Sequence, residues 1–260
     1  MKGFYFALQH LTRIRIYNGE FDRRAFGRSP VFFPAVGLVL AGLVLLAKLL
    51  FDMLFPPPLA AACVVIAIVA LTGGMHLDGL MDTMDGMCSG RPREIKLAIM
   101  KDSRVGAFGI LGLACLLLLK FAVFLSMPWE QAVPVILLAM VFSRWAMVYA
   151  IARFPYARQE GLGLLYSMYT GKKELLLASA CTFVIAAAVA GAAGLVILVL
   201  TWAWAYCLGC RVSSHLGGLT GDVYGAVAET TELVVYAVSM PVYEYLPALF
   251  HLPPSIAGLL

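Results

Sequence analysis

Three aspartates with helical spacing are the chemically most informative residues of the sequence. Asp78, Asp82 and Asp85 follow two glycines in the segment GGMHLDGLMDTMDG, residues 73–86. Residues three and four positions apart on a helix share a face, so the three carboxylates would lie together. Like charges repel unless a cation lies among them, and oxygen-only ligands favour Mg²⁺ or Mn²⁺. The segment therefore predicts a metal held for chemistry on phosphates, with His76 as a neighbouring polar group.

A simpler interpretation of the same segment is a solvated turn at a membrane boundary. Aspartates cap helix N-termini without any ligand, and a histidine there is an ordinary hydrogen-bonding residue. For one aspartate we would favour this interpretation. Three on one face favour the metal, and Asp82, which stands between the other two, is expected to matter most.

A second charged group follows in SGRPREIKLAIMKDSRVGAFG, residues 89–109. Lys101, Asp102, Ser103 and Arg104 stand just before an apolar run. In one interpretation Asp102 or Ser103 caps the helix that begins there. In the other, Lys101 and Arg104 bind a substrate phosphate beside the helix N-terminus. Pro92 predicts a short interfacial helix between the two charged groups.

Further polar residues interrupt the second half of the chain. Arg158 belongs to YARQEGLG, residues 156–163, and Asp222 follows a glycine-rich turn in SSHLGGLTGDVYGAVAETTEL, residues 213–233. Glu229 and Glu232 then fall inside an apolar run. Carboxylates within a membrane are costly and need a partner, and Arg144, deep in an earlier apolar run, is the predicted one.

These residues must be positioned by membrane-spanning helices. Of the 260 residues, 62% are hydrophobic and 13% are charged, whereas about a quarter of a soluble domain is charged. Apolar runs occur at residues 31–55, 59–72, 106–127, 132–152, 175–190, 195–210 and 223–240. The sequence predicts an all-α, polytopic membrane protein with about six to seven spans, forming one domain over residues 1–260. Because the run 59–72 is shorter than the roughly 20 residues of a span, we expect its helix to continue through Gly73 towards Asp78.

The basic residues predict the orientation of these helices. All but three of the 19 Lys and Arg residues fall in alternate connections, which include the N-terminus and residues 75–105. Such residues mark the cytoplasmic side of a membrane. We therefore expect a multi-pass protein of the cell (inner) membrane whose acidic loop is cytoplasmic. Membrane lipid is the expected surrounding partner, and the net charge of +4 needs no nucleic acid.

The segments GGMHLDGLMDTMDG, IMKDSRVGAFG and GLTGD…GA…E…TEL together closely resemble the cobalamin synthase, or adenosylcobinamide-GDP ribazoletransferase, family. ALQHLTRIRI, FFPAVGLVLAG and YARQEGLG are similar to the same family, in the same order. Methionines and Cys88 replace smaller residues typical of the acidic loop. The resemblance covers about residues 5–240, and the tail at 241–260 is unassigned.

The resemblance implies a Mg²⁺-dependent reaction. α-Ribazole, or its 5′-phosphate, attacks the cobinamide-side phosphorus of adenosylcobinamide-GDP, GMP leaves, and the nucleotide loop of the corrinoid is closed. The catalytic group would be Asp78, Asp82, Asp85 and His76, with the three aspartates as metal ligands. The substrate-binding group would be Lys101, Asp102, Ser103, Arg104, Arg158 and Asp222. Homo-oligomerisation is left open.

Two other functions compete with this one. Pieces of D-x-x-D-G and G-x-x-x-D-x-x-x-D at residues 74–86 look like the CDP-alcohol phosphotransferase signature, which would indicate a phospholipid head-group transferase. Here the pieces overlap, occur in the wrong order and lack the usual Ala-Arg. A transporter would place acids near mid-membrane in repeated halves. No repeat is visible, and most acids fall in the connections.

Overall fold

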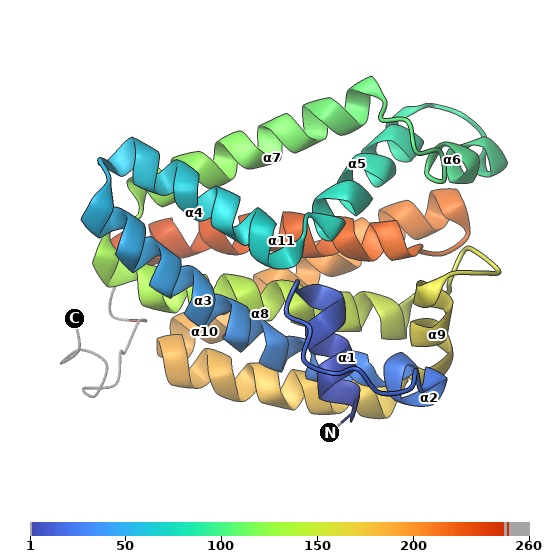
Figure 1. The fold of residues 1–260 in the computed structure, drawn as a ribbon, viewed down its shortest axis with the longest axis horizontal. Coiled ribbons are helices and arrows are strands. Elements are labelled where there is room, and N and C mark those ends of the chain that lie inside the picture. Colours follow the sequence, from blue (N-terminus) through green and yellow to red (C-terminus); the bar gives the residue numbers. More distant parts are fainter. Residues whose placement is uncertain (1, 247–248, 250–260) are drawn as a thin grey trace.

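A computed structural model describes residues 2–246 and 249. These residues form a bundle of helices without strands, in which Tyr156 and Leu219 make one isolated parallel bridge. The elements are α1 (Lys2–Leu11), α2 (Arg23–Gly27), η1 (Ser29–Phe32), α3 (Phe33–Leu54), α4 (Pro57–Thr72), α5 (Met75–Cys88), α6 (Arg93–Ile99), α7 (Ala107–Ser126), α8 (Trp129–Arg153), α9 (Leu162–Tyr169), α10 (Lys172–Leu216) and α11 (Gly221–Tyr245) (Figure 1). The predicted all-α class is confirmed.

Helix α8 forms the centre of the bundle. It packs against α3, α10 and α11, and 89% of its most apolar 18-residue window is buried inside the protein. Small residues bring the helices close: a Cβ atom added to Gly37 of α3 would lie 2.6 Å from the carbonyl oxygen of Met140. The outer helices instead turn leucine, valine and phenylalanine outward, as expected for helices that face lipid.

Four helical segments are long and apolar enough to cross a membrane: Ser29–Leu54, Ala107–Ser126, Trp129–Arg153 and Lys172–Leu216. Taken together, α4 and α5 would add a fifth. Helix α10 is 45 residues long, but its backbone is non-helical at Ala190 and Gly191. Its two halves run in opposite directions (Figure 1), which agrees with the two separate apolar runs in the sequence. The total of six to seven crossings stays a prediction.

The predicted continuation of the second apolar helix through Gly73 is wrong. Helix α4 ends at Thr72, and Gly73 and Gly74 both have a φ of 71°, in the left-handed region that favours glycine. Helix α5 then begins at Met75, at an angle of 92° to α4. The two glycines therefore place the three aspartates on a separate helix.

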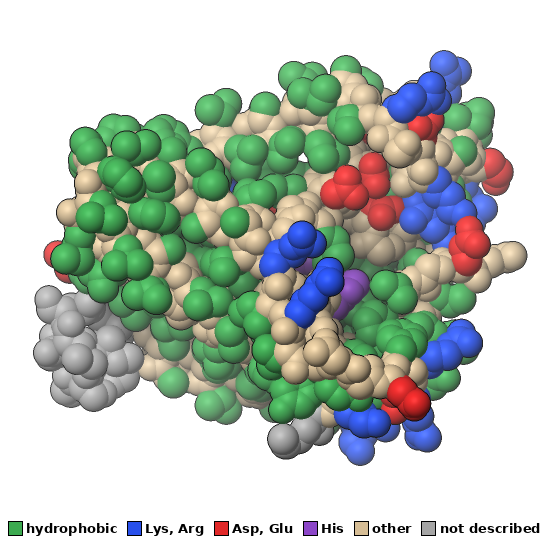
Figure 2. All heavy atoms as spheres, in the orientation of Figure 1, with side chains coloured by type: hydrophobic (Ala, Val, Ile, Leu, Met, Phe, Trp, Pro, Cys, Tyr) green, Lys and Arg blue, Asp and Glu red, His purple; other side chains and the backbone are tan. Residues whose placement is uncertain are grey.

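Charged side chains gather at one end of the molecule, here called the polar end (Figure 2). It comprises α2, α6, residues 154–161 and the beginnings of α7 and α11. Residues from distant parts of the sequence are joined there by backbone hydrogen bonds. Leu219 donates to Pro155 and Ala157 donates to Leu219, each over 2.8 Å. The unassigned tail begins as the last turn of α11, and most of the rest of residues 241–260 lies outside the described residues.

Candidate active site

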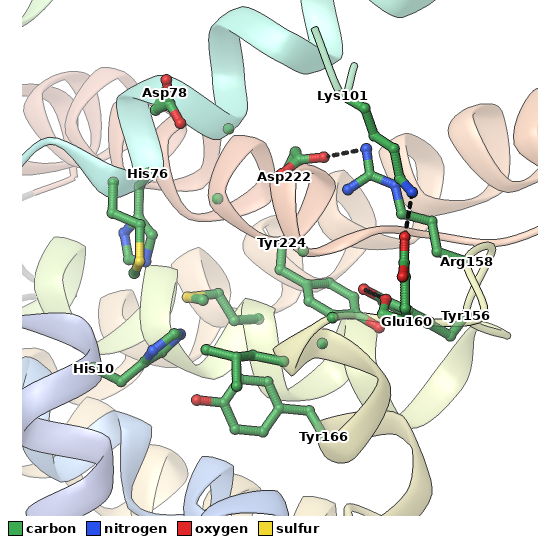
Figure 3. Close-up of a pocket in the computed structure, with 18 residues that line it drawn as sticks. His10, His76, Asp78, Lys101, Tyr156, Arg158, Glu160, Tyr166, Asp222 and Tyr224 are labelled. Atoms are coloured by element: carbon green, nitrogen blue, oxygen red, sulfur yellow. Dashed lines mark hydrogen bonds and ion pairs between the residues drawn. The ribbon is translucent and has the colours of Figure 1, made fainter. Parts of the chain in front are cut away.

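A cavity of about 520 Å³ opens between α1, α5, residues 156–163 and the start of α11. Its lining has two parts (Figure 3). We call the charged part the mouth: Asp78, Lys101, Arg158, Glu160 and Asp222. The other part, called the floor, is aromatic and apolar: His10, His76, Met147, Tyr166 and Tyr224. The cavity therefore offers charge at one side and a ring-sized apolar compartment at the other.

Close packing of α5 on α11 assembles the carboxylates of the mouth. A Cβ atom added to Gly79 would lie 2.6 Å from the carbonyl oxygen of Asp222, so only glycine allows this approach. Asp78 and Asp222 consequently line one cavity, and Asp82 lies one helical turn beyond Asp78. Arg158 compensates part of the charge, with its Nη2 atom 2.8 Å from Oδ2 of Asp222.

Asp82 has no cationic partner of its own in the part of the chain that the structure describes. It lies past the bend at Gly73, outside the four spanning helices. Burial, and then the charges of Asp222 and Asp78, raise its pKa from 3.8 to about 7, although Arg158 acts in the opposite direction. Burial also raises the pKa of Asp222, against the effect of Arg158. A bound cation would stabilise the ionised form of these neighbouring carboxylates.

These residues fit Mg²⁺ better than a metal enclosed entirely by protein. Among residues 2–246 and 249, no three His, Cys, Asp or Glu side chains lie close enough together to hold a metal ion by themselves. Mg²⁺ usually takes one or two carboxylates and completes its octahedron with water and substrate phosphates. Asp78 and Asp222 supply oxygen donors of this kind at the mouth, and Asp82 lies one helical turn beyond Asp78 on α5.

Asp85 differs from the other two aspartates of α5. Its side chain is buried, and its carboxylate accepts hydrogen bonds from the backbone N–H groups of Gly106, over 2.7 Å, and Gly109, over 2.8 Å. It thus satisfies the first turn of α7 from outside that helix. The predicted capping of this helix by Asp102 or Ser103 is wrong, because Gly106 occupies the N-cap position.

The charged group before α7 divides between two places. Lys101 lines the cavity and forms an ion pair with Glu160. Arg104 is turned to solvent, with 88% of its side chain exposed, and pairs with Asp102 over 2.6 Å. Hydrogen bonds from Arg104 lower the pKa of Asp102 to about 2. Ser103 is exposed as well. The substrate-binding roles of residues 102–104 stay predictions, since these side chains do not line the cavity.

Most of the floor carries no signal in the sequence. His10 of α1 packs edge-on against Tyr166 at a centroid distance of 5.5 Å, and Phe26 stacks on Tyr166 at 4.8 Å. Burial lowers the pKa of His10 to about 4, so this ring is neutral at physiological pH. In an apolar chain, scattered aromatic residues look like core residues. These differ from other core residues only in that they line one cavity.

A second set of buried charges lies outside the cavity, between α7, α8 and α11. Arg144 donates to Glu232 over 3.0 Å, which confirms the predicted partnership. Lys120, which no sequence pattern singled out, donates to Glu229 over 2.7 Å and to Glu232 over 2.8 Å. We call these four residues the buried charge cluster. Its carboxylates are already paired with cations, which argues against their being ion ligands of a transporter.

Comparison with known proteins identifies the family. A sequence profile described as cobalamin-5-phosphate synthase matches residues 3–240. The chain belongs to this family. It is 43% identical over 216 residues to an adenosylcobinamide-GDP ribazoletransferase of Roseiflexus sp. (strain RS-1), covering 83% of this chain and 80% of that protein.

Other members of the cobalamin-5-phosphate synthase family match over nearly their whole length. The enzyme of the same name from Desulfitobacterium hafniense (strain Y51) is 39% identical, covering 93% of this chain and 97% of its own. That from Desulforamulus reducens is 39% identical, covering 87% and 91%. No solved structure matches the chain. The cavity and its two-part lining therefore supply the structural basis for assigning roles to the residues of this family member.

Proposed function

We propose that this protein is an adenosylcobinamide-GDP ribazoletransferase of cobalamin biosynthesis. A hydroxyl oxygen of α-ribazole, or of its 5′-phosphate, forms a bond to the cobinamide-side phosphorus of adenosylcobinamide-GDP. The bond from that phosphorus to the oxygen of GMP breaks, GMP leaves, and the hydroxyl proton is released. Family membership supports the reaction. The observation that supports this cavity as its site is the meeting of carboxylates from α5 and α11 with Arg158 and Lys101 at one mouth.

Phosphoryl transfer depends on positioning and charge neutralisation more than on covalent chemistry by the protein. Asp78, Asp82 and Asp222 are the proposed ligands of Mg²⁺, which would neutralise the phosphate oxygens and the charge that develops on them. Arg158 and Lys101 are proposed to bind the remaining phosphate oxygens. The role of Asp85 is to fix α7 against α5, and in this way it positions the mouth. Arg104 remains a second candidate for phosphate binding.

The basic residues support an orientation with the polar end in the cytoplasm. Arg91, Arg93, Lys96, Lys101 and Arg104 lie in the one connection between α5 and α7. Further basic residues lie on α2 and at the start of α10. The positive-inside rule then favours a mouth on the side where a GTP-derived substrate occurs. The protein is accordingly proposed to be a multi-pass protein of the cell membrane with its site facing inward.

The direct test incubates membranes containing the protein with adenosylcobinamide-GDP, α-ribazole and Mg²⁺. Formation of cobalamin and GMP in equal amounts is expected, and their absence would show that the proposed reaction is wrong. Asp82→Asn preserves size but removes the charge, and should abolish turnover at every Mg²⁺ concentration. Glu94→Gln, which removes an exposed carboxylate outside the cavity, is the matched control and should leave activity unchanged. Near-normal activity of Asp82→Asn at low Mg²⁺ would exclude a metal-binding role.

A further inference from the structure

Three buried side chains on the floor of the cavity, His76, Tyr224 and Tyr166, have polar atoms that lack hydrogen-bond partners among the described residues. His76 is 3% exposed, and neither of its ring nitrogens has a partner among the described residues. Tyr224 is 2% exposed, and its hydroxyl oxygen likewise has none there. Both side chains line the cavity (Figure 3). A buried polar atom left unpaired destabilises a folded protein, so such atoms point to a ligand that would pair with them.

The backbone holds His76 and Tyr224 firmly in place. Helix α5 approaches α11 at Gly225, where an added Cβ would lie 3.1 Å from the Cα atom of His76. Around the remaining floor, Tyr166 is stacked on Phe26 and contacts His10 edge-on. Rings that pack on one another in this way keep a fixed shape. The compartment is therefore preformed, as small-molecule sites usually are.

The chemistry of the floor selects a ring with few polar atoms. The imidazole of His76 brings two unpaired ring nitrogens to the floor, and these can form hydrogen bonds with a ligand. The Tyr224 hydroxyl offers a donor and an acceptor as well. Met147 and the ring of Tyr166 complete a mostly apolar surface. A dimethylbenzimidazole ring has apolar faces, two methyl groups and one free acceptor nitrogen. Guanine carries donors and acceptors along its whole edge, and more of them would be left unpaired there.

The volume of the cavity also favours ribazole as the ligand. A cavity of about 520 Å³ is in the range of sites that enclose one small molecule, and a corrinoid macrocycle is far larger. Ribazole can be enclosed whole, whereas adenosylcobinamide-GDP could place only its nucleoside part in the cavity. With the base of ribazole on the floor, the attached ribose would extend towards Asp78, Asp222 and Arg158 at the mouth, which is where the phosphates are proposed to bind.

We propose that the floor of this cavity binds the aromatic base of ribazole, and that His76 and Tyr224 are the residues that determine which base is accepted. The ring nitrogen accepts a hydrogen bond from one of the two side chains, and the other pairs with a ribose hydroxyl. This inference rests on the proposed function for the identity of the ligand. It assigns His76 to binding and positioning, with no proton transfer required of it.

The test measures binding of α-ribazole alone to the detergent-purified protein, by the fluorescence of the benzimidazole, together with the KM for each substrate. His76→Leu should raise the Kd and KM for α-ribazole on the order of tenfold or more, because the ligand nitrogen then faces an apolar side chain. The KM for adenosylcobinamide-GDP should stay within about twofold. His76→Gln restores a donor and should recover part of the affinity, and Tyr224→Phe should cost about three- to tenfold.

Controls separate binding from folding. His76→Leu removes two unpaired polar atoms from the interior, so its unfolding temperature should not fall. His215→Gln makes the conservative change at a histidine of α10 that does not line the cavity, and should bind α-ribazole as the natural protein does. Replacing α-ribazole by the riboside of adenine should reduce affinity for the natural protein more than for His76→Gln.

Three outcomes would overturn the inference. A raised KM for adenosylcobinamide-GDP alone would place guanine on the floor. A reduced kcat with both KM values unchanged would make His76 a proton-transfer group. Unchanged binding in His76→Leu would leave the histidine structural. Failure of the proposed function is distinguishable from all three, since it would appear as binding of α-ribazole by the natural protein without formation of cobalamin and GMP.

Discussion

The carboxylate of Asp85 accepts a hydrogen bond from the backbone N–H of Gly109 across the contact between α5 and α7. Its second oxygen accepts from Gly106, so both oxygens face N–H donors. An asparagine in this place would point its own NH₂ group at one of these donors. Asp85→Asn should therefore reduce the free energy of unfolding by about 1–2 kcal/mol.

The unfolding temperature of the purified protein in detergent measures this effect. Asp78→Asn makes the same change on the same helix, at a side chain that lines the cavity. It should leave the unfolding temperature unchanged or raise it, because it removes a charge from a group of like charges, while activity is lost. Equal destabilisation by both variants would contradict the distinction between a structural and a functional aspartate.

The raised pKa of Asp82 makes Mg²⁺ binding dependent on pH. In the metal-free folded protein this pKa is about 7, above its ordinary value of 3.8. As the pH falls below 7 the carboxylate takes up a proton, which Mg²⁺ must displace. The apparent affinity for Mg²⁺ should then fall by up to about tenfold per pH unit below 7 and level off above it.

Titrating activity with Mg²⁺ on both sides of pH 7 checks this prediction. Saturating Mg²⁺ favours the ionised form and should extend activity to lower pH. The stability of the metal-free protein should depend on pH in the opposite direction. The folded state holds the proton of Asp82 more tightly than the unfolded state does, so the free energy of unfolding should fall as the pH rises between 3.8 and about 7. The same apparent affinity at every pH would exclude Asp82 from the metal site.

The helices and the residues of the candidate site on α5 could be predicted from the sequence because both depend on local patterns. Continuous apolar runs marked the limits of α3, α7 and α8 to within a few residues. The cost of a carboxylate in an apolar run was enough to predict that Arg144 pairs with Glu229 or Glu232, and the structure shows that the partner is Glu232. The acidic segment likewise follows from spacing on a single helix, α5.

What could not be predicted depends on contacts between distant residues. Asp82 and Asp85 have the same residue type on the same helix, and their environments differ because α7 packs on Asp85 whereas Asp222 of α11 acts on Asp82. The bend after Thr72 arises from two consecutive glycines, which in a span can equally serve close packing. The floor joins His10 to Tyr224 across most of the chain, and no local pattern marks either residue.

Arg158 is the best-placed side chain to bind a phosphate of adenosylcobinamide-GDP. It lines the cavity, contacts Asp222 over 2.8 Å, and is mostly buried. Arg158→Ala should lower kcat/KM for this substrate about ten- to a hundredfold, as expected for hydrogen bonds to a charged group. Steady-state kinetics with each substrate varied in turn would measure the loss.

Arg104→Ala removes an exposed arginine that pairs with Asp102 outside the cavity. A larger loss in Arg104→Ala would move the phosphate site to residues 101–104.

Cys88 tests the orientation of the protein in the membrane. It is exposed and lies at the end of α5 that reaches the polar end. In a variant with no other cysteine, it should react with a membrane-impermeant thiol reagent only after the cells are permeabilised. Phe55→Cys, in the connection between α3 and α4, should react in intact cells, because this connection lies at the opposite end of the bundle (Figure 1). Labelling of Cys88 from outside would invert the topology.

The buried charge cluster should stabilise the bundle only as a balanced set. Lys120 and Arg144 are matched by Glu229 and Glu232, and all four side chains are at least 96% buried. Removing one partner leaves an unpaired charge in an apolar interior, which costs about 3–5 kcal/mol. Arg144→Met alone should therefore lower the unfolding temperature strongly in detergent.

Combining Arg144→Met with Glu232→Gln restores the neutrality of the cluster and should recover much of the lost stability, since the two residues are in contact. Glu94→Gln, which breaks an exposed pair, should have almost no effect. A double variant less stable than Arg144→Met would show that the hydrogen bonds of Glu232 matter more than the balance of charge.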